Sequence, residues 1–267
     1  MIRLDGVEKT YRTRRGDLVR AVEDVTLEVA ENEFVTLVGP SGCGKSTLLK
    51  LVAGLTPVTR GTVRVRDTVV REPFADVGIV FQHPVLLPWR TVLANVLFSA
   101  EMLGLDPTSQ RQRALDLLEL SGLGGFEMRY PRELSGGMQQ RVAICRALLP
   151  DPSLLLMDEP FGALDAMTRE EMGFELLRIW EERRKTILFV THSIPEAILL
   201  ADKVVAMTPR PGRLARVLAI DLPRPRTVDL EFDPKFKAYS DEVRGLIFAG
   251  RGSSRGTGAG KARDGGQ

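Results

Sequence analysis

Alternating apolar and polar positions in the first part of the chain predict half-buried strands. Residues 22–29 and 62–70 alternate in this way, and a further strand is expected at 1–7. One-sided burial of this kind is typical of an antiparallel sheet, which we therefore expect in the N-terminal part.

Continuous apolar runs, which do not alternate with polar residues, predict strands that are buried on both faces. They occur at Phe34–Val38, 77–81, 154–157 and Thr186–Thr191, and a last run at 204–207 closes the predicted core. The N-terminal part therefore combines the antiparallel sheet with a strand-loop-helix unit that begins at Phe34–Val38.

Helical patterns and stop signals predict helices between these strands. The expected helices cover residues 45–53, 91–103, 110–120 and 138–149. Gly54 and Pro150 are stop signals for the first and last of them. The middle two follow a proline-bracketed apolar loop at 83–90 and form a helical insertion. Ser193 and Glu196 match a capping box, so another helix is expected to begin there.

The C-terminal part differs in composition from the rest. Residues 209–225 are rich in proline and arginine. Asp233 and Pro234 then cap a short amphipathic helix. Its expected apolar face consists of Phe236, Tyr239, Val243 and Leu246 or Ile247. From Arg251 onward Gly, Ser and Arg dominate without large apolar side chains, so we expect a disordered tail.

The overall composition is that of an ordinary soluble globular protein. A chain of 267 residues with 43% hydrophobic residues can form one large domain or two modest ones. No apolar run is long enough to predict a membrane span, and the N-terminus lacks the apolar core of a signal peptide, so a cytosolic location is expected. Cys43 and Cys145 are too few for a disulfide framework and have no spaced companions for a metal site.

A basic net charge is one sign of a nucleic-acid partner. The formal net charge is +2, but residues 251–267 contain four basic residues and one acid, a charge of +3. Residues 1–250 therefore carry −1. The basicity belongs to the tail, and no nucleic-acid partner is expected.

Residues 39–47, with the sequence GPSGCGKST, are the strongest functional signal. They match the phosphate-binding pattern G-x-x-x-x-G-K-[ST], and they lie between the apolar run Phe34–Val38 and a predicted helix, as the motif requires. The glycines let backbone N–H groups turn toward a polyphosphate, and the helix N-terminus faces the same charge. Lys45 is expected to reach the β- and γ-phosphates, and the Ser46 hydroxyl to bind Mg²⁺.

Two acidic residues and a histidine stand at the ends of buried strands. Asp158 and Glu159 end the run that begins at residue 154. Adjacent side chains on a strand point to opposite faces, so one carboxylate is expected to hold Mg²⁺ or its water and the other to orient a nucleophilic water. His192 follows Thr186–Thr191 and is poised to hydrogen-bond a γ-phosphate.

Three features have two readings each from the residues alone. Ser135, which precedes two glycines and a predicted helix, is either a simple N-cap or part of a second anion site. Tyr11, in a polar hairpin-like loop at 11–16, either stacks on a base or is ordinary packing. Trp89, directly after the second proline of the loop at 83–90, is either core or an exposed docking side chain.

Taken together, the order and spacing of these motifs resemble the ATP-binding subunit of an ABC transporter over residues 2–235. The matching segments are residues 39–47 (Walker A), Gln82 (Q-loop), 134–137 (signature), 154–159 (Walker B), 163–165 (D-loop) and His192 (switch histidine). Two positions depart from the family pattern: Met138 replaces the Gln that often completes the signature, and Ser193 replaces the Asp that often follows the switch histidine. Neither position takes part in ATP hydrolysis in the family. Segments 86–92, 161–165 and 209–213 look most like the nitrate/sulfonate/taurine importer branch.

The resemblance implies a fold and a domain layout. The expected α/β fold is a P-loop NTPase core with an antiparallel β subdomain and an inserted α-helical subdomain at about residues 83–150. The ATPase domain covers 2–235, a C-terminal amphipathic helix covers 236–250, and the disordered tail covers 251–267.

The resemblance also implies roles for individual residues, with ATP and Mg²⁺ as cofactors. Glu159 is the implied general base, His192 steadies the γ-phosphate, Gln82 senses Mg²⁺ or the attacking water, and Asp165 communicates across a dimer. The implied ATP-binding residues are Tyr11, Gly39, Pro40, Ser41, Gly42, Cys43, Gly44, Lys45, Ser46 and Thr47, with Ser135, Gly136 and Gly137 from the opposite protomer. The implied Mg²⁺ ligands are Ser46, Gln82 and Asp158.

The implied partners follow from the same family. They are a second copy of the chain or a paralogous cassette, integral-membrane permease subunits and, indirectly, a solute-binding protein. The expected location is therefore cytoplasmic, at the inner face of the cell membrane.

Two other functions are weighed against ATP-driven import. A soluble ABC ATPase that acts on DNA or ribosomes usually resembles tandem cassettes or carries long coiled-coil or zinc insertions, and none is visible between His83 and Glu133. A P-loop kinase accounts for residues 39–47 but not for 135–137 or the Asp158–Glu159 pair.

Overall fold

The computed structural model describes residues 1–162 and 164–248. Its strands are β1 (Ile2–Arg12), β2 (Leu18–Val29), β3 (Phe34–Val38), β4 (Arg60–Val65), β5 (Thr68–Val69), β6 (Val77–Val80), β7 (Leu154–Asp158), β8 (Thr186–Thr191), β9 (Lys203–Met207) and β10 (Leu214–Ala219). Its helices are α1 (Lys45–Val52), α2 (Val92–Met102), α3 (Pro107–Leu120), η1 (Pro131–Glu133), α4 (Gly136–Leu148), α5 (Ala166–Glu182), α6 (Ile194–Leu200), η2 (Val228–Phe232) and α7 (Pro234–Phe248). The predicted disordered tail at 251–267 lies outside the described residues.

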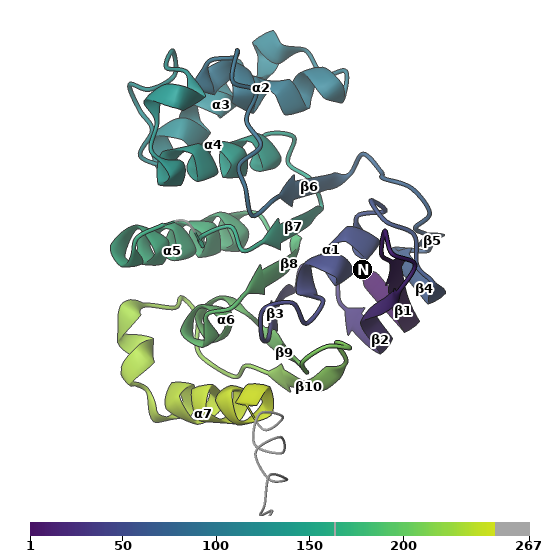
Figure 1. Cartoon of the computed structure of the whole chain (residues 1–267). Coiled ribbons are helices and arrows are strands. Elements are labelled where there is room, and N and C mark those ends of the chain that lie inside the picture. Colours follow the sequence, from purple (N-terminus) through teal and green to yellow (C-terminus); the bar gives the residue numbers. More distant parts are fainter. Residues whose placement is uncertain (163, 249–267) are drawn as a thin grey trace, which may run out of the picture.

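The strands form two sheets with α1 between them (Figure 1). One sheet is antiparallel, in the order β2-β1-β4-β5. The other has the order β10-β9-β3-β8-β7-β6, and all its pairs are parallel except the edge pair β9–β10. Both predicted sheet types are therefore present, and α1 packs its apolar side chains against each.

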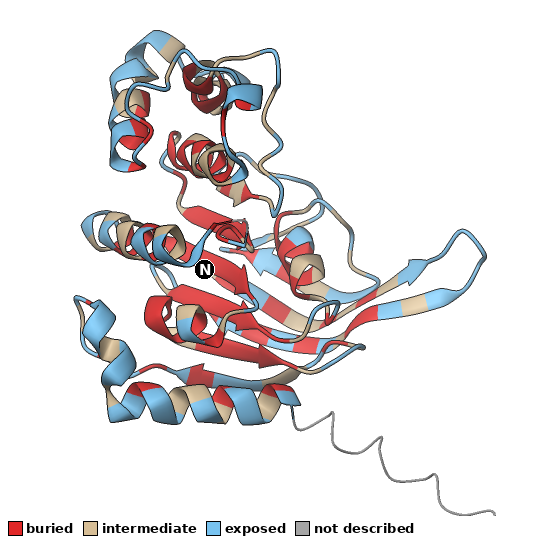
Figure 2. Ribbon diagram, turned by 60° about the vertical axis from the view of Figure 1, so that its left-hand side comes forward, coloured by how far each residue is buried: buried red, intermediate tan, exposed pale blue. Residues whose placement is uncertain are grey.

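The parallel sheet is the most buried part of the molecule, as Figure 2 shows. Every residue of β3, β7 and β8 is buried, which is why their sequences are nearly continuous apolar runs. Aromatic rings join this sheet to α5. Phe189 packs on Phe34 and Phe161 with ring centroids 6.0 and 5.5 Å apart, and Trp180 meets Phe34 edge-on at 5.9 Å.

The helical subdomain consists of α2, α3, η1 and α4 and lies beyond the β6 edge of the sheet (Figure 1). Its buried Asn95 holds the proline-bracketed loop. The side-chain oxygen accepts from Leu87 N at 2.8 Å, and the amide nitrogen donates to the carbonyls of Leu87, Arg90 and Thr91. The loop is thus fixed while Trp89 stays 71% exposed, which decides against a core role for this side chain.

Several local predictions need correction. Tyr11 and Arg12 belong to β1, where they pair with Val19 and Leu18, because the strands continue to a tight turn at 13–17. The single strand expected at 62–70 is the hairpin β4–β5, which turns at Arg66 with φ +52°.

The predicted capping box at α6 is only half formed. Ser193 Oγ accepts from Glu196 N at 3.4 Å, but Ser193 N donates to Thr191 Oγ1 at 2.9 Å instead of to Glu196. The serine therefore caps the helix without the reciprocal bond.

Four elements have no counterpart in the predictions: α5, β10 and the short 3-10 helices η1 and η2. Of these, β10 is an edge strand in which only Leu218 is buried. Helix α7 begins at Pro234 and buries Phe236, Val243 and Ile247 against α6 and the β9 region. Among the described residues, no helix is long and apolar enough to cross a membrane.

We predict that Phe189→Ala lowers the free energy of unfolding by about 4 kcal/mol, because it removes a fully buried ring from between two others. Phe232 is 84% exposed, so Phe232→Ala is the control and is expected to change stability by less than about 0.5 kcal/mol. Urea denaturation followed by circular dichroism measures both. Equal effects of the two substitutions would contradict this account of the core.

Candidate functional site

A polar cavity of about 310 Å³ lies where the carboxyl ends of the parallel strands meet the β1–β2 hairpin. It is lined by Tyr11, Val19, Ala21, Ser41, Gly42, Gly44, Lys45, Ser46, Thr47, Gln82, Glu159 and Arg210. These residues come from segments far apart in the sequence, and they include most of the side chains selected from sequence motifs.

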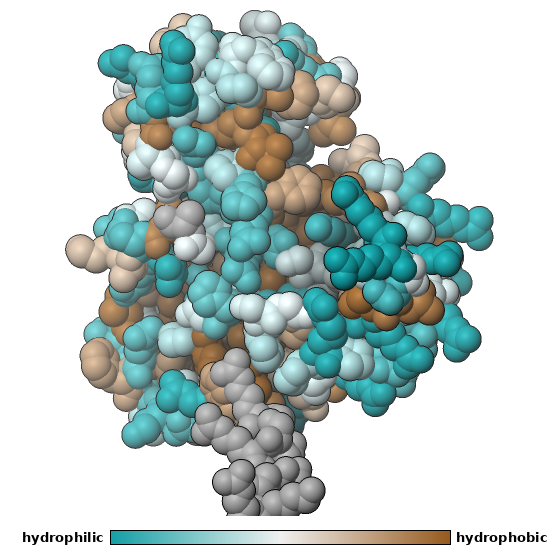
Figure 3. Space-filling view, in the orientation of Figure 1, coloured by the Kyte–Doolittle hydropathy of each residue, from teal (hydrophilic) through white to brown (hydrophobic). Residues whose placement is uncertain are grey.

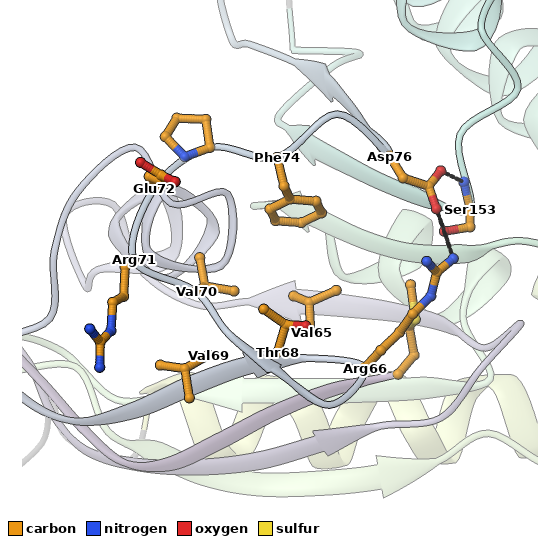
Figure 4. Close-up of a pocket in the computed structure, with 12 residues that line it drawn as sticks. Val65, Arg66, Thr68, Val69, Val70, Arg71, Glu72, Phe74, Asp76 and Ser153 are labelled. Atoms are coloured by element: carbon orange, nitrogen blue, oxygen red, sulfur yellow. Dashed lines mark hydrogen bonds and ion pairs between the residues drawn. The ribbon is translucent and has the colours of Figure 1, made fainter.

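A larger cavity of about 380 Å³ lies between the β4–β5 hairpin and residues 70–76 (Figure 4). Its walls are mainly apolar, and its main polar group is already satisfied: Arg66 Nη2 contacts Asp76 Oδ2 and Ser153 Oγ, both at 2.7 Å. Because no predicted site residue lines it, the smaller cavity is the better candidate for chemistry.

The loop at 39–44 has the geometry of a phosphate cradle. Gly42 and Gly44 have positive φ angles of 74° and 105°. A Cβ on Gly44 would stand 2.7 Å from the Ala21 carbonyl oxygen, so only glycine fits there. Helix α1 begins directly after it at Lys45 and directs its N-terminus toward the loop.

Lys45 is 5% exposed, and its ammonium is held by the loop itself. Nζ donates to the carbonyls of Gly39 at 2.8 Å and Pro40 at 3.1 Å. Gly39 and Pro40 therefore serve as backbone acceptors for the lysine, while Ser41, Gly42 and Gly44 form the cavity wall.

Asp158 and Ser46 form the centre of the candidate Mg²⁺ site. Ser46 Oγ donates to Asp158 Oδ1 at 2.8 Å. Burial raises the pKa of the Asp158 carboxyl, and this hydrogen bond opposes the shift. Gln82, which follows β6, lines the same cavity as Ser46, and its side chain contains an amide oxygen. Hard oxygen donors of this kind suit Mg²⁺.

No group of three or more His, Cys, Asp or Glu side chains is arranged to hold a metal in the part of the chain that the structure describes.

Glu159 and His192 form a hydrogen-bonded pair beside the phosphate loop. Glu159 Oε2 lies 3.1 Å from His192 Nδ1, and since a carboxylate only accepts, Nδ1 carries the proton. Glu159 has φ +46°, and its N–H donates to the Val190 carbonyl at 2.9 Å. Strand β7 ends at Asp158, so this turn of the backbone, and not the alternation along a strand, sets the direction of the Glu159 side chain.

Residues 135–137 lie outside the cavity that the other site residues share. Ser135 Oγ accepts from Met138 N at 3.2 Å, so it is an N-cap of α4. Gly136 is exposed, with nothing within 4 Å of where a Cβ would stand. Asp165 likewise caps α5 through Thr168 N at 3.1 Å. Within one chain these residues do not join the site.

Cys43 differs from expectation and Arg210 was missed. We expected the Cys43 thiol beside the phosphates, but it is 1% exposed and buried under the loop, where its sulfur lies 3.9 Å from Lys45 Nζ. Arg210 lines the cavity although no chemical motif marks it; its segment, residues 209–213, is a sign of the importer branch in the sequence but gives no indication of a binding role.

Comparisons with known proteins agree with this geometry. A model of the ABC transporter family matches residues 22–162. The taurine import ATP-binding protein TauB of Burkholderia thailandensis is 46% identical, over 86% of this chain and 90% of that protein. The nitrate import ATP-binding protein NrtD of Synechocystis is 43% identical, over 92% and 94% of the two chains.

A solved dimeric ATP-binding cassette in a post-hydrolysis state, bound to ADP and Pi, superimposes with a TM-score of 0.75. The two chains are 33% identical, and the match covers 84% of this chain and 100% of the solved one. The expected resemblance and fold class are thus confirmed.

Both thiols should resist alkylation in the folded chain. Burial raises the pKa of Cys43, and it raises the pKa of Cys145 to about 11, so little reactive thiolate is present near neutral pH. At pH 7.5 we expect iodoacetamide to modify the native chain at least about tenfold more slowly than the chain unfolded in guanidinium chloride. Mass spectrometry of timed samples measures this. Rapid labelling of native Cys43 with loss of ATP binding would contradict its placement under the loop.

Proposed function

Since the chain belongs to the ABC transporter family and is an ATP-hydrolysing subunit, we propose that it powers uptake of a small solute of the nitrate, sulfonate or taurine class through a separate membrane permease. The solute class rests on the import proteins for taurine and nitrate that match nearly the whole chain. The observation that carries the ATPase mechanism is the cavity that brings residues 41–47, Gln82 and Glu159 together.

In this proposal the cavity binds ATP. The backbone N–H groups of the loop and the N-terminus of α1 surround the polyphosphate. The Lys45 ammonium, which the carbonyls of Gly39 and Pro40 hold in place, donates to the polyphosphate as well. Tyr11, at the end of β1 and 38% exposed, provides an aromatic face for the adenine.

Mg²⁺ would be held by Ser46, Asp158 and Gln82, whose oxygens share this cavity or border it. The bound ion would neutralise charge on the β- and γ-phosphates. Asp158 is already oriented by its bond from Ser46, so the ligand geometry is preorganised.

Hydrolysis transfers the terminal phosphoryl group to water, and Glu159 is the proposed general base that accepts the proton of that water. His192 fixes the carboxylate through the 3.1 Å bond to its Oε2. The other ring nitrogen of His192, Nε2, is the group that steadies the γ-phosphate in this proposal.

A second copy of the chain would complete the site. Ser135, Gly136 and Gly137 stand exposed or partly exposed at the N-terminus of α4, away from the cavity of their own chain. A helix N-terminus of this kind suits a γ-phosphate bound on the opposite protomer, and Asp165 would face the dimer interface. ATP would then favour the closed dimer and hydrolysis would remove that preference.

The loop at 83–90 is the proposed docking site for the permease. Val85 and Trp89 are 62% and 71% exposed, while Arg146 fixes the loop by donating to the carbonyls of Pro84 at 2.8 Å and Val85 at 2.9 Å. Apolar surface also gathers on the lower part of the helical subdomain in Figure 3. Rigid exposed aromatic side chains are typical anchors of an interface. The chain would thereby lie at the inner face of the membrane, with the solute-binding protein as an indirect partner.

Glu159→Gln should lower the rate of ATP hydrolysis by about a hundredfold or more, since the amide cannot accept the proton, while ATP still binds. With the γ-phosphate retained, we also expect an ATP-dependent dimer in size-exclusion chromatography. The control is Glu171→Gln on the exposed face of α5, which should hydrolyse at the wild-type rate. Wild-type hydrolysis by Glu159→Gln would refute the general-base assignment.

Trp89→Ala should reduce recovery of permease subunits by about tenfold or more when the tagged chain is purified from solubilised native membranes, without changing hydrolysis by the isolated chain. Phe232→Ala, equally apolar and 84% exposed, is the control and should recover normal amounts. Mass spectrometry identifies the co-purified proteins. If wild-type chain brings down ribosomes or nucleic acid and no permease, the importer proposal is wrong.

A further inference from the structure

The Arg210 side chain lies against the phosphate loop at Gly42. Its Nε donates to the Gly42 carbonyl at 3.3 Å, and its Nη2 lies 3.6 Å from where a Cβ on Gly42 would stand. The side chain also lines the same cavity as Lys45 and Ser46. The guanidinium group is therefore anchored to the middle of the loop through one nitrogen.

Among the described residues, the charge of Arg210 has no opposite charge paired with it. In residues 1–162 and 164–248, no carboxylate forms an ion pair with it. Its loop neighbour Arg213 differs, because Nη2 of that residue contacts Glu23 Oε2 at 3.1 Å. Within the part of the chain that the structure describes, Nε is the nitrogen of Arg210 that donates a hydrogen bond, so both terminal amino groups can donate to an anion in the cavity.

The segment that carries Arg210, residues 208–213, is held in place by hydrogen bonds within itself and to β2. Thr208 closes it: its N–H donates to the Arg213 carbonyl, and its Oγ1 accepts from Arg213 N, both at 3.0 Å. Gly212 N donates to Ala21 O at 3.1 Å, and Gly212 O accepts from Glu23 N at 2.9 Å. The segment is thereby tied to β2.

The same segment also touches the phosphate loop. A Cβ on Gly212 would stand 1.8 Å from the Cys43 carbonyl oxygen, so glycine is required for this close approach. The backbone under Arg210 is thus preorganised, and only its side chain loses freedom when an anion binds.

We propose that Arg210 is a second cationic ligand of the nucleotide and donates hydrogen bonds to the β- or γ-phosphate from the Gly42 side of the loop. Lys45 and Arg210 are the cations that line the cavity, and Glu159 is the carboxylate. A polyphosphate brings several negative charges, which a planar guanidinium with free N–H groups suits. This inference rests on ATP occupying the cavity as proposed above.

Arg210→Ala should weaken binding of ATP by about tenfold, a modest effect because the side chain is exposed to solvent. Binding of ADP should weaken equally if the contact is to the β-phosphate and stay unchanged if it is to the γ-phosphate, which ADP lacks. Binding of AMP, which lacks the phosphates that Arg210 contacts, should change by less than about twofold. Displacement of a fluorescent ATP analogue from the monomeric chain measures all three. Arg210→Lys should recover part of the loss, since it keeps the charge but not the fork of donors.

Arg213→Ala is the matched control, because it removes a cation from the same segment that is already paired with Glu23 and lies outside the cavity. It should bind ATP as the wild type does. Unchanged ATP affinity in Arg210→Ala would overturn the inference, and so would an equal loss for AMP, which would place the contact at the ribose or base. A wild-type chain that binds no nucleotide would instead overturn the proposed function, and this inference with it.

Discussion

The parallel register of β3, β8 and β7 is the constraint on which the rest of the site depends. Val38 pairs with Thr191, and Asp158 pairs with Val190, so three strands end at one level of the sheet. The phosphate loop, the acidic pair and His192 each begin within a residue or two of these ends. The hydrogen-bonded sheet therefore brings the phosphate loop next to groups that lie more than a hundred residues away in the sequence, close enough for Ser46 Oγ to donate to Asp158 Oδ1.

The antiparallel sheet supports this edge from behind. Its strand β2 presents the Ala21 carbonyl so closely to Gly44 that the loop and the sheet fit only in one arrangement, and the same carbonyl accepts from Gly212. The phosphate loop is thus enclosed between β2 and the 208–213 segment. Enclosure keeps its backbone N–H groups oriented, and it explains why Cys43 faces the interior.

The helical subdomain is joined to the same edge through a short set of polar contacts. Gln140 of α4 donates to the Phe81 carbonyl at 3.0 Å, next to Gln82, and Arg146 of α4 holds the carbonyls of Pro84 and Val85. The exposed loop is therefore bonded to the subdomain that carries residues 135–137. Gln82 therefore adjoins a unit that contains both the proposed permease contact and the proposed contact to a second nucleotide.

The sequence by itself determined the chemistry of the site. Two local patterns predict it: the spacing of residues 39–47, and the apolar runs that end in Asp158, Glu159 and His192. Each pattern lies within one short segment, so it can be recognised without knowing which other segments pack around it. Three features follow only from the tertiary structure: the position of Tyr11 on a long hairpin, the burial of the Cys43 side chain, and the position of Arg210 in the wall of the cavity. The tertiary structure also decided the edge strand β10, whose sequence carries little apolar signal. These depend on contacts between distant segments, and such contacts leave no period or spacing in the sequence from which they can be inferred.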